Sequence, residues 1–422
     1  MTVPLPHTFR AFRHANFRRF FAGQGLSLIG TWVQQVAMAW LVWRISGSAW
    51  LLGAVAFCSN ISILLLGPVA GVLADRVHKR PALVVTQSLL LAQAVALALL
   101  AWSGRVQVWH LIACALWLGT VTAFDVPLRQ TLFVHLVDDR DDVANAIALN
   151  SFMVNGARVV GPALAGALLA VVSEAVCFAI NAATFVAVMW AIAGLRWPDS
   201  AAPSATRGGW WRSWREGAGY AFGFAPVRAL LILVGVLAWT VAPYSALMPV
   251  YAGRIYGGGA QTLGFLLSAA GAGALASTIY LASRRSIRGL GKVIAAAAGA
   301  SGLALAAFAY LTILPLALVL MAIVGGGMIL AAASSNTIIQ TVVEDRMRGR
   351  VVGFYTMAFL GVAPLGNLAA GALGNAIGVP TTFAVNGLVC FVTAVWLWRQ
   401  LPTLAVLMRP TYERLGIVTQ DG

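Results

Sequence analysis

The sequence predicts an all-α membrane protein with twelve transmembrane helices in two six-helix bundles, and three observations support this fold class. Of the 422 residues, 60% are hydrophobic and 10% are charged, and the mean hydropathy is +0.85, far from the averages of a soluble domain. Apolar runs long enough to cross a bilayer, which requires about 20 residues, recur along the chain. A repeat relates the two halves of the sequence.

The predicted spans are separated by short patches that contain Arg, Asp, Gly or Pro. Each run is mainly apolar over the length that a membrane helix needs. Their approximate extents are 17–43, 49–74, 82–102, 108–133, 144–170, 173–195, 226–253, 261–283, 291–311, 314–340, 350–371 and 377–401.

The net charge of +15 would suggest a nucleic-acid partner if the basic residues formed one patch. They lie instead in short loops, so the positive-inside rule is the better interpretation and no nucleic-acid partner is expected. With a cytoplasmic amino terminus, only Arg44, Arg105 and Arg254 fall in outer loops, while Arg129 and Arg158 fall within spans. We therefore expect a multi-pass protein of the cell inner membrane with both termini in the cytoplasm.

The longest inner connection divides the chain into two halves. Its sequence "RWPDSAAPSATRGG" has the Pro, Ser and Gly content of a linker, and "WWRSWREGAGYAFGF" follows with residues suited to the membrane interface. The predicted domains are an N-terminal six-helix bundle (1–195), a cytoplasmic linker with an amphipathic segment (196–225), a C-terminal six-helix bundle (226–401) and a cytoplasmic tail (402–422).

A repeat supports this division. The 21 residues from Gly161 align without gaps with those from Gly366, and 8 positions are identical. The matched Phe178 and Phe383, like the matched asparagines of the same segments, are not packing glycines, so small-residue packing alone is a weak explanation. Two related membrane-embedded halves are a common plan of secondary transporters, which bind substrate near the midplane between the halves.

Specific motifs resemble the major facilitator superfamily. The stretch "GVLADRVHKR" from Gly71 is similar to the signature of its loop between helices 2 and 3, with His78 where the family usually has Gly. The segments "NFRRFFAGQGLSLIGTWVQQVAMAWLVWRISGSAWLLG", "AFDVPLRQTLF", "NAIALNSFMVNGARVVGPALAG" and "RGRVVGFYTMAFLGVAPLGNLAAG" resemble its drug and siderophore exporters, which include enterobactin exporters and macrolide efflux proteins. The likeness covers nearly the whole chain and implies the major facilitator fold.

Physical chemistry suggests a role for the charges of this loop. Gly71 would let two helix backbones approach closely. Asp75 could face the amino terminus of a helix that begins near Gly349 or Arg350, where unpaired N–H groups favour a carboxylate. A carboxylate inside a span costs about 3 kcal/mol, so Asp125 needs a cation.

The resemblance implies that these charges form a conformational latch, which holds the two halves together on the cytoplasmic side and parts when the cavity opens inward. Either Lys79 or Arg76 could reach Asp125, and Arg129, one turn away, is another candidate partner. The predicted latch residues are Gly71, Asp75, Arg76, Lys79, Arg80, Asp125 and Arg129.

The segment "GARVVGPALAG" resembles the antiporter motif of the same superfamily, in which Gly and Pro bend a helix and keep its contact face smooth. Gly156, Gly161, Pro162 and Gly166 supply this helix-packing pattern. Ordinary small-residue packing explains it about as well.

Polar residues within spans are the candidates for a substrate cavity, because each needs a cavity or a partner. A polar stripe at helical spacing on the first span is one such group, with interhelical hydrogen bonding as the alternative. Arg158 would either meet Asp125 or receive an anionic or electron-rich substrate group. The predicted cavity residues are Gln24, Thr31, Gln34, Met38, Asn60, Asn155, Arg158, Tyr244, Ser335 and Asn336.

We expect a secondary active transporter that works by alternating access and exports small amphipathic compounds, such as drug-like molecules or siderophores. An importer or a non-transporting sensor on the same fold is the alternative. Protons are a candidate coupling ion, and Asp125 is the one carboxylate suited to carry them. The sequence shows no nucleotide-binding Walker loop and no HExxH or GxSxG motif, so no enzyme activity, catalytic residue, metal or cofactor is predicted; the expected partners are a small-molecule substrate and the lipid bilayer.

Overall fold

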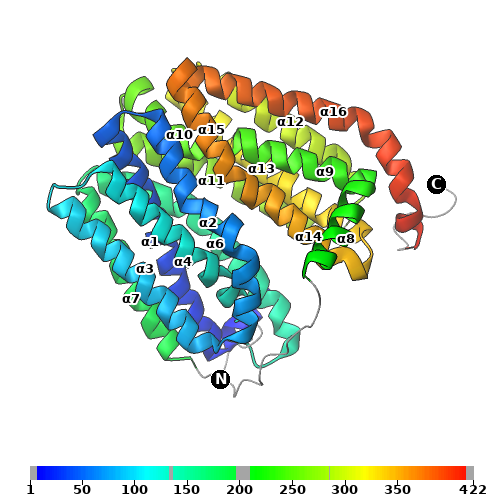
Figure 1. The fold of residues 1–422 in the computed structure, drawn as a ribbon, viewed down its shortest axis with the longest axis horizontal. Helices are drawn as coiled ribbons and strands as arrows, with labels where there is room; N and C mark the ends of the chain where they lie inside the picture. The colour runs from blue at the N-terminus through cyan, green and yellow to red at the C-terminus, as the bar shows by residue number, and fades with distance from the viewer. Residues whose placement is uncertain (1–6, 133–135, 196–209, 285, 415–422) are drawn as a thin grey trace. The chain divides into compact units, whose positions relative to one another are not determined.

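The computed structural model describes residues 7–132, 136–195, 210–284 and 286–414, which form helices joined by short connections (Figure 1). No strand occurs within these ranges. Twelve of the described helical segments are long and apolar enough to cross a membrane. The predicted all-α membrane fold with twelve spans is thus confirmed.

Packing divides the chain into two compact units. Unit 1 comprises Met1–Gly47, Cys58–Ala205 and Pro249–Ser268, and unit 2 comprises Ser48–Phe57, Thr206–Met248 and Ala269–Gly422. Each unit therefore contains one short segment from the other half of the sequence. The division at residues 196–225 into two bundles of six spans stays a prediction.

Unit 1 is built around α1, which packs on α6 and α7, while α3 packs on α4 and α7. Leu97, Leu111 and Phe178 are fully buried between these helices. The helices of the unit are η1 (His7–Arg13), α1 (Ala15–Ser46), most of α2 (Ala49–Arg76), α3 (Lys79–Trp102), α4 (Val108–Gln130), η2 (Arg140–Asp142), α6 (Val143–Leu169), α7 (Glu174–Ala193), η4 (Tyr251–Ile255) and the start of α11 (Gly259–Ser283).

Unit 2 is centred on α12, which packs on α13 and α16. The buried rings of Phe308 on α12 and Phe383 on α16 lie 6.3 Å apart between centroids. Its helices, besides the rest of α11, are α8 (Trp210–Gly223), α9 (Ala225–Val236), η3 (Leu237–Val241), most of α10 (Tyr244–Val250), α12 (Leu290–Phe308), α13 (Leu314–Val342), α14 (Asp345–Thr356), η5 (Met357–Gly361), α15 (Val362–Ile377) and α16 (Val379–Arg414).

Large apolar side chains cover the outside of both units. Leu99 and Trp190 in unit 1 and Val392 in unit 2 are among the most exposed, with relative exposures of 65%, 82% and 62%. Such exposure would be costly in water and is ordinary in lipid, where the backbone is satisfied within each helix. The surface therefore agrees with a membrane-embedded chain.

Two spans contain π-helical turns next to prolines. The span Ala225–Ile255 includes η3 and η4, and the span Asp345–Ile377 includes η5. Proline cannot donate the i→i−4 hydrogen bond and clashes with the preceding turn, and a π-helical turn absorbs such a local mismatch. Pro243 lies between η3 and η4, and Pro364 lies just after η5.

Helix ends differ from the predicted span ends where polar residues continue a helix beyond the apolar run. The helix expected to begin near Gly349 or Arg350 begins at Asp345. The last helix, expected to end at residue 401, runs to Arg414 through Pro402 and Pro410. Hydropathy locates the part of a helix that lies in lipid, whereas backbone hydrogen bonding alone sets where the helix stops.

Glycines allow close helix contacts within each unit. A Cβ added to Gly166 on α6 would lie 3.0 Å from the Cα of Gly264 on α11, inside unit 1. A Cβ added to Gly371 on α15 would lie 2.9 Å from the Cα of Gly53 on α2, inside unit 2. Gly166 and Gly371 are matched positions of the repeat, so the repeat extends to their packing.

The predicted packing motif of α6 is only partly used in this way. Gly161 lies against the side chain of Trp32 on α1, and Pro162 is buried within a continuous helix. In contrast, a Cβ added to Gly156 or Gly71 would meet no atom within 4 Å. The close backbone approach expected at Gly71 stays a prediction, because no described residue comes within 4 Å of that added Cβ.

The amino-terminal segment is held to the connection between α4 and α6 by ion pairs to one buried carboxylate. Asp142 is 1% exposed. Its Oδ2 lies 2.9 Å from Nε2 of His14 and 2.8 Å from Nε of Arg13, and its Oδ1 lies 3.0 Å from Nε of Arg10. The hydrogen bond from His14, assisted by the charges of Arg13 and Arg10, lowers the pKa of the Asp142 carboxyl below its usual value. We call these four residues the N-terminal anchor.

Candidate functional site

A buried amide network occupies the interior of unit 1. Nε2 of Gln34 donates to Oε1 of Gln93 at 3.0 Å, and Nδ2 of Asn181 donates to Oε1 of Gln34 at 2.8 Å. Gln93 donates in turn to the carbonyl of Cys114 at 3.2 Å. The three amide side chains are fully buried, so the network joins α1, α3, α4 and α7 by hydrogen bonds that need no water.

The first-span stripe is thus not a uniform cavity lining. The interpretation of Gln34 as a cavity residue is wrong here, because neighbouring helices satisfy its amide. Gln24 and Met38 are each 4% exposed, and Oε1 of Gln24 has no hydrogen-bond partner in the described part of the chain. Thr31 is half-buried and is the most accessible member of the predicted stripe.

Asp125 is the centre of a second buried polar group, the Asp125 cluster, formed with Thr86, Gln87 and Arg129. Oδ1 accepts hydrogen bonds of 2.7 Å from both Oγ1 of Thr86 and Nε2 of Gln87. Oδ2 is ion-paired with Arg129 one helical turn away. Asp125 is fully buried, whereas the Arg129 side chain is 20% exposed, so the pair connects the interior of unit 1 with its surface.

Arg129 is therefore the ion-pair partner of Asp125, one of the alternatives that the sequence left open. Arg80 is exposed at the start of α3 and donates to the carbonyl of Ala193 at 3.2 Å, which ties α3 to the end of α7. Arg76 is exposed and Lys79 half-buried. The side chain of Asp75 lies outside what the structure describes, and the latch as a whole stays a prediction.

Arg158 lies on a half-buried surface of unit 1 that we call the Arg158 surface, formed by Thr31 and Trp32 of α1 with Asn155 and Arg158 of α6. The guanidinium carbon of Arg158 is 5.9 Å from the centre of the Trp32 ring. Asn155, three residues earlier on α6, donates from Nδ2 to the carbonyl of Ser151 at 2.8 Å. This surface presents a cation, an aromatic face and an amide together.

The other cavity candidates differ in accessibility. Asn60 and Tyr244 are half-buried. Ser335 is fully buried and donates back to the carbonyl of Ala331 at 2.7 Å, as a serine within a helix often does. Asn336 is half-buried, and its Oδ1 is a buried atom without a hydrogen-bond partner among the described residues.

Sequence reasoning missed several partners of the residues it selected. Trp32 was passed over because a tryptophan in an apolar run resembles ordinary lipid-facing surface. Gln93 and Gln87, both on α3, are polar residues within a span, and the rule applied to the first span could have found them. Asn181 was visible only as a matched position of the repeat.

The fold and the half-buried polar surfaces are typical of membrane transporters, and comparisons with known proteins specify the family. Residues 7–409 match the family model described as transmembrane secretion effector. The chain belongs to this family of the major facilitator superfamily.

Curated relatives are similar over most of their length. The staphyloferrin A transporter of Staphylococcus aureus (strain NCTC 8325 / PS 47) is 25% identical over 380 residues, which cover 87% of this chain and 92% of the relative. The multidrug efflux pump Tap of Mycobacterium tuberculosis (strain ATCC 25618 / H37Rv) is 29% identical over 376 residues, which cover 86% of each chain.

Among solved structures, a POT family transporter in complex with 5-aminolevulinic acid matches with a TM-score of 0.75 at 10% sequence identity. The match covers 93% of this chain and 97% of that transporter. At this identity the likeness concerns the fold alone, and it agrees with the major facilitator fold predicted from the motifs.

Proposed function

We propose that this transporter exports small amphipathic compounds across the bacterial inner membrane by alternating access. The relatives, a staphyloferrin A transporter and a multidrug efflux pump, support compounds of this class. The Arg158 surface is the observation that carries the proposal. A guanidinium beside an indole ring attracts anionic or electron-rich aromatic groups of a small amphipathic compound.

In this proposal, the conformational change occurs at the two short segments that pack in the unit of the other half of the sequence. Residues 48–57 pack in unit 2 and residues 249–268 pack in unit 1, at glycines that leave no side chain between the backbones. Smooth glycine contacts part and re-form without unlocking interdigitated side chains. Alternating access would then proceed by separation of these contacts, while the amide network keeps α1, α3, α4 and α7 together.

Asp125 is the proposed site of proton coupling. Its carboxylate is held by Arg129, Thr86 and Gln87, so protonation would release Arg129 while the two neutral hydrogen bonds persist. Such a change would alter the charge that the cluster presents at the surface of unit 1. Coupling to a proton gradient follows if release of Arg129 depends on the state of the transporter.

Two ion pairs agree with the proposed orientation, in which both termini are cytoplasmic. Arg44 and Glu174, both predicted in outer loops, are joined by bonds of 2.9 and 3.1 Å. Arg13 and Asp139, both predicted inside, are joined at 2.9 Å. A reporter fused to the carboxyl terminus tests the absolute orientation, because alkaline phosphatase is active only outside the cytoplasm and would be inactive here.

Efflux from energised cells tests the function. Cells that produce the wild type, Arg158→Gln or the control Arg105→Gln would be loaded with dyes, antibiotics or catecholate siderophores. Arg105 is an exposed residue of a predicted outer loop, so its replacement removes the same charge elsewhere. We expect efflux by the wild type and the control, and a loss of about tenfold in Arg158→Gln, the effect of one charged hydrogen bond.

The same assay separates the alternatives. An importer would raise, rather than lower, the cellular content of a compound, and a sensor would leave that content unchanged. Absence of efflux for every compound, with folded protein in the membrane, would contradict the proposed function.

A further inference from the structure

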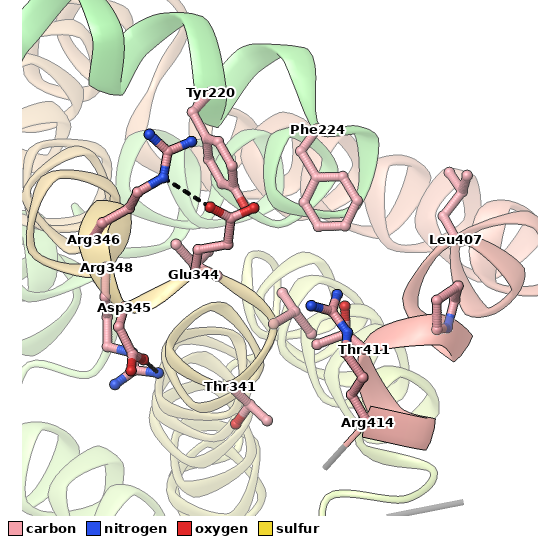
Figure 2. A pocket seen from close by; sticks show the side chains of 13 residues that line it. Tyr220, Phe224, Thr341, Glu344, Asp345, Arg346, Arg348, Leu407, Thr411 and Arg414 are labelled. Carbon is pink, nitrogen blue, oxygen red and sulfur yellow. Dashed lines mark hydrogen bonds and ion pairs between the residues drawn. The ribbon is translucent and has the colours of Figure 1, made fainter.

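Unit 2 contains a pocket of about 780 Å³, and none of the candidate residues described above lines it (Figure 2). It is formed where α8, the turn between α13 and α14, and the last turns of α16 meet. All of its lining residues belong to unit 2, so the pocket is a feature of that unit alone. We call it the α16 pocket.

The lining carries more positive than negative charge. Its ionisable residues are Glu344, Asp345, Arg346, Arg348 and Arg414. Arg346 is paired with Glu344 at 3.0 Å and Arg348 with Asp345 at 2.5 Å. Within the described chain Arg414 forms no ion pair or hydrogen bond, and Figure 2 shows its side chain extending from the end of α16 toward the centre of the pocket. One cation of the pocket thus remains available to a ligand.

The remaining walls are aromatic or apolar. Phe224 follows α8 and faces the interior of the pocket, and Leu407 lines the side formed by α16 (Figure 2). Pro410, also on α16, is a further lining residue. Tyr220 adds a hydroxyl beside the ion pair of Arg346 and Glu344. An arginine next to an apolar wall suits a ligand with an anionic group and a hydrocarbon chain, since each part meets a matching surface.

The position of the pocket favours a lipid. Helix α8 forms the amphipathic part of the predicted cytoplasmic linker, and its sequence combines tryptophans and arginines as helices at a membrane interface do. Anionic phospholipids are enriched in the leaflet on that side, and basic pockets between membrane helices bind their headgroups.

We propose that the α16 pocket binds the phosphate headgroup of an anionic phospholipid, with Arg414 as its main charged contact and the acyl chain along Phe224 and Leu407. The bound lipid would link α8, α14 and α16, and so hold the amphipathic part of the linker to the end of the last helix. This role does not depend on what the protein transports.

Native mass spectrometry of the purified full-length chain in detergent tests the proposal. The protein would be titrated with phosphatidylglycerol and with phosphatidylethanolamine of identical acyl chains. We expect phosphatidylglycerol to bind more tightly, and Arg414→Gln to weaken its binding about fivefold, the effect of one arginine at an anionic lipid surface. Arg414→Lys should keep most of the affinity, because a point charge also binds phosphate.

Arg409→Gln is the matched control, because Arg409 lies on the same helix but is paired with Glu413 at 2.7 Å and does not line the pocket. Phosphatidylglycerol binding that is unchanged in Arg414→Gln, or that falls equally in Arg409→Gln, would overturn the proposal. A competition experiment with glycerol phosphate, which has no acyl chains, tests whether the site requires a lipid. If glycerol phosphate displaced phosphatidylglycerol at equal concentration, the site would be one for soluble phosphate compounds and the lipid assignment would be wrong.

Discussion

At the scale of single residues, the structure shows how polar side chains are accommodated within membrane helices. Gln34 and Asp125 both lie within predicted spans, and both are fully buried. Each has partners on neighbouring helices, because an unsatisfied polar group in this setting is costly. Arg158 differs, since it lies on a half-buried surface with an aromatic neighbour. The hydrogen-bond and ion-pair partners of a polar side chain therefore distinguish residues that stabilise the fold from residues suited to bind a ligand.

Gln34→Leu should destabilise the protein by about 1 kcal/mol, because it removes two hydrogen bonds between membrane helices that average about 0.6 kcal/mol each. Reversible unfolding of the purified protein in detergent measures the effect. Gln35→Leu is the control, because Gln35 is the exposed neighbouring residue and its replacement should leave stability within about 0.5 kcal/mol. Equal stability of the two variants would mean that the amide network contributes nothing.

The residue scale is also where sequence reasoning was weakest. Gln24, Thr31, Gln34 and Met38 share one helix face, which the periodicity predicted. Their environments differ because the helices opposite them differ: Gln34 meets Gln93 and Asn181, while Thr31 is partly open. Which helices lie opposite a given face is a property of tertiary packing that one sequence does not reveal.

At the scale of helices, the length of the apolar runs was sufficient to predict all twelve candidate spans. The differences lie at helix ends and irregular turns. α16 continues to Arg414 and α14 begins at Asp345, since a helix does not stop where its apolar residues stop. The π-helical turns near Pro243 and Pro364 have no sequence signal beyond the proline itself.

The N-terminal anchor gives a prediction for pH dependence. The folded-state pKa of Asp142 is lowered, so its contribution is fully present above the usual carboxyl pKa of about 3.9 and is lost as the pH falls through the lower folded-state value. We therefore expect η1 to stay docked from pH 8 to pH 5 and to be released only in stronger acid. Hydrogen exchange of the η1 amides over this pH range measures docking.

Asp142→Asn mimics the protonated state at neutral pH. It should release η1 at pH 7, with a local loss of about 2 kcal/mol for a hydrogen bond to a charged group, limited by the half-exposed position of Arg13. Asp141→Asn, one residue earlier and exposed, is the control. Unchanged protection of η1 in Asp142→Asn would show that the anchor does not hold the segment.

Gly371→Ala tests a close glycine contact between α15 and α2. The added Cβ would lie 2.9 Å from both the carbonyl oxygen of Ala49 and the Cα of Gly53, and overpacking of this kind costs about 1 to 3 kcal/mol. Gly349→Ala is the control, because a Cβ there meets open space and alanine favours a helix. The midpoint temperature of thermal unfolding should be lowered in Gly371→Ala and unchanged or raised in Gly349→Ala. The reverse order would show that the close contact at Gly371 does not exist.

At the scale of the whole molecule, the repeat predicted from the sequence corresponds to a repeated type of contact. Gly166 and Gly371 are matched positions, and each packs against a glycine near the start of another span, Gly264 and Gly53 respectively. The sequence repeat identified Gly166 and Gly371 as a matched pair. It did not indicate that Gly264 and Gly53 are their contact partners, because these contacts join segments far apart in the chain. The exchange of residues 48–57 and 249–268 between the units was unpredictable for the same reason.

The central claim is that this transporter of the major facilitator superfamily exports amphipathic compounds with energy coupled through Asp125. Uptake into inverted membrane vesicles, energised by respiration, tests it most directly, with wild type, Asp125→Asn and the control Arg105→Gln. Asparagine keeps the size of Asp125 and can accept the hydrogen bonds of Thr86 and Gln87, but cannot pair with Arg129. We predict that wild-type and control vesicles accumulate a drug-like dye or a siderophore and that an uncoupler abolishes this accumulation. Asp125→Asn vesicles should show no accumulation. Accumulation that persists in Asp125→Asn, or that occurs only in right-side-out vesicles, would contradict the account.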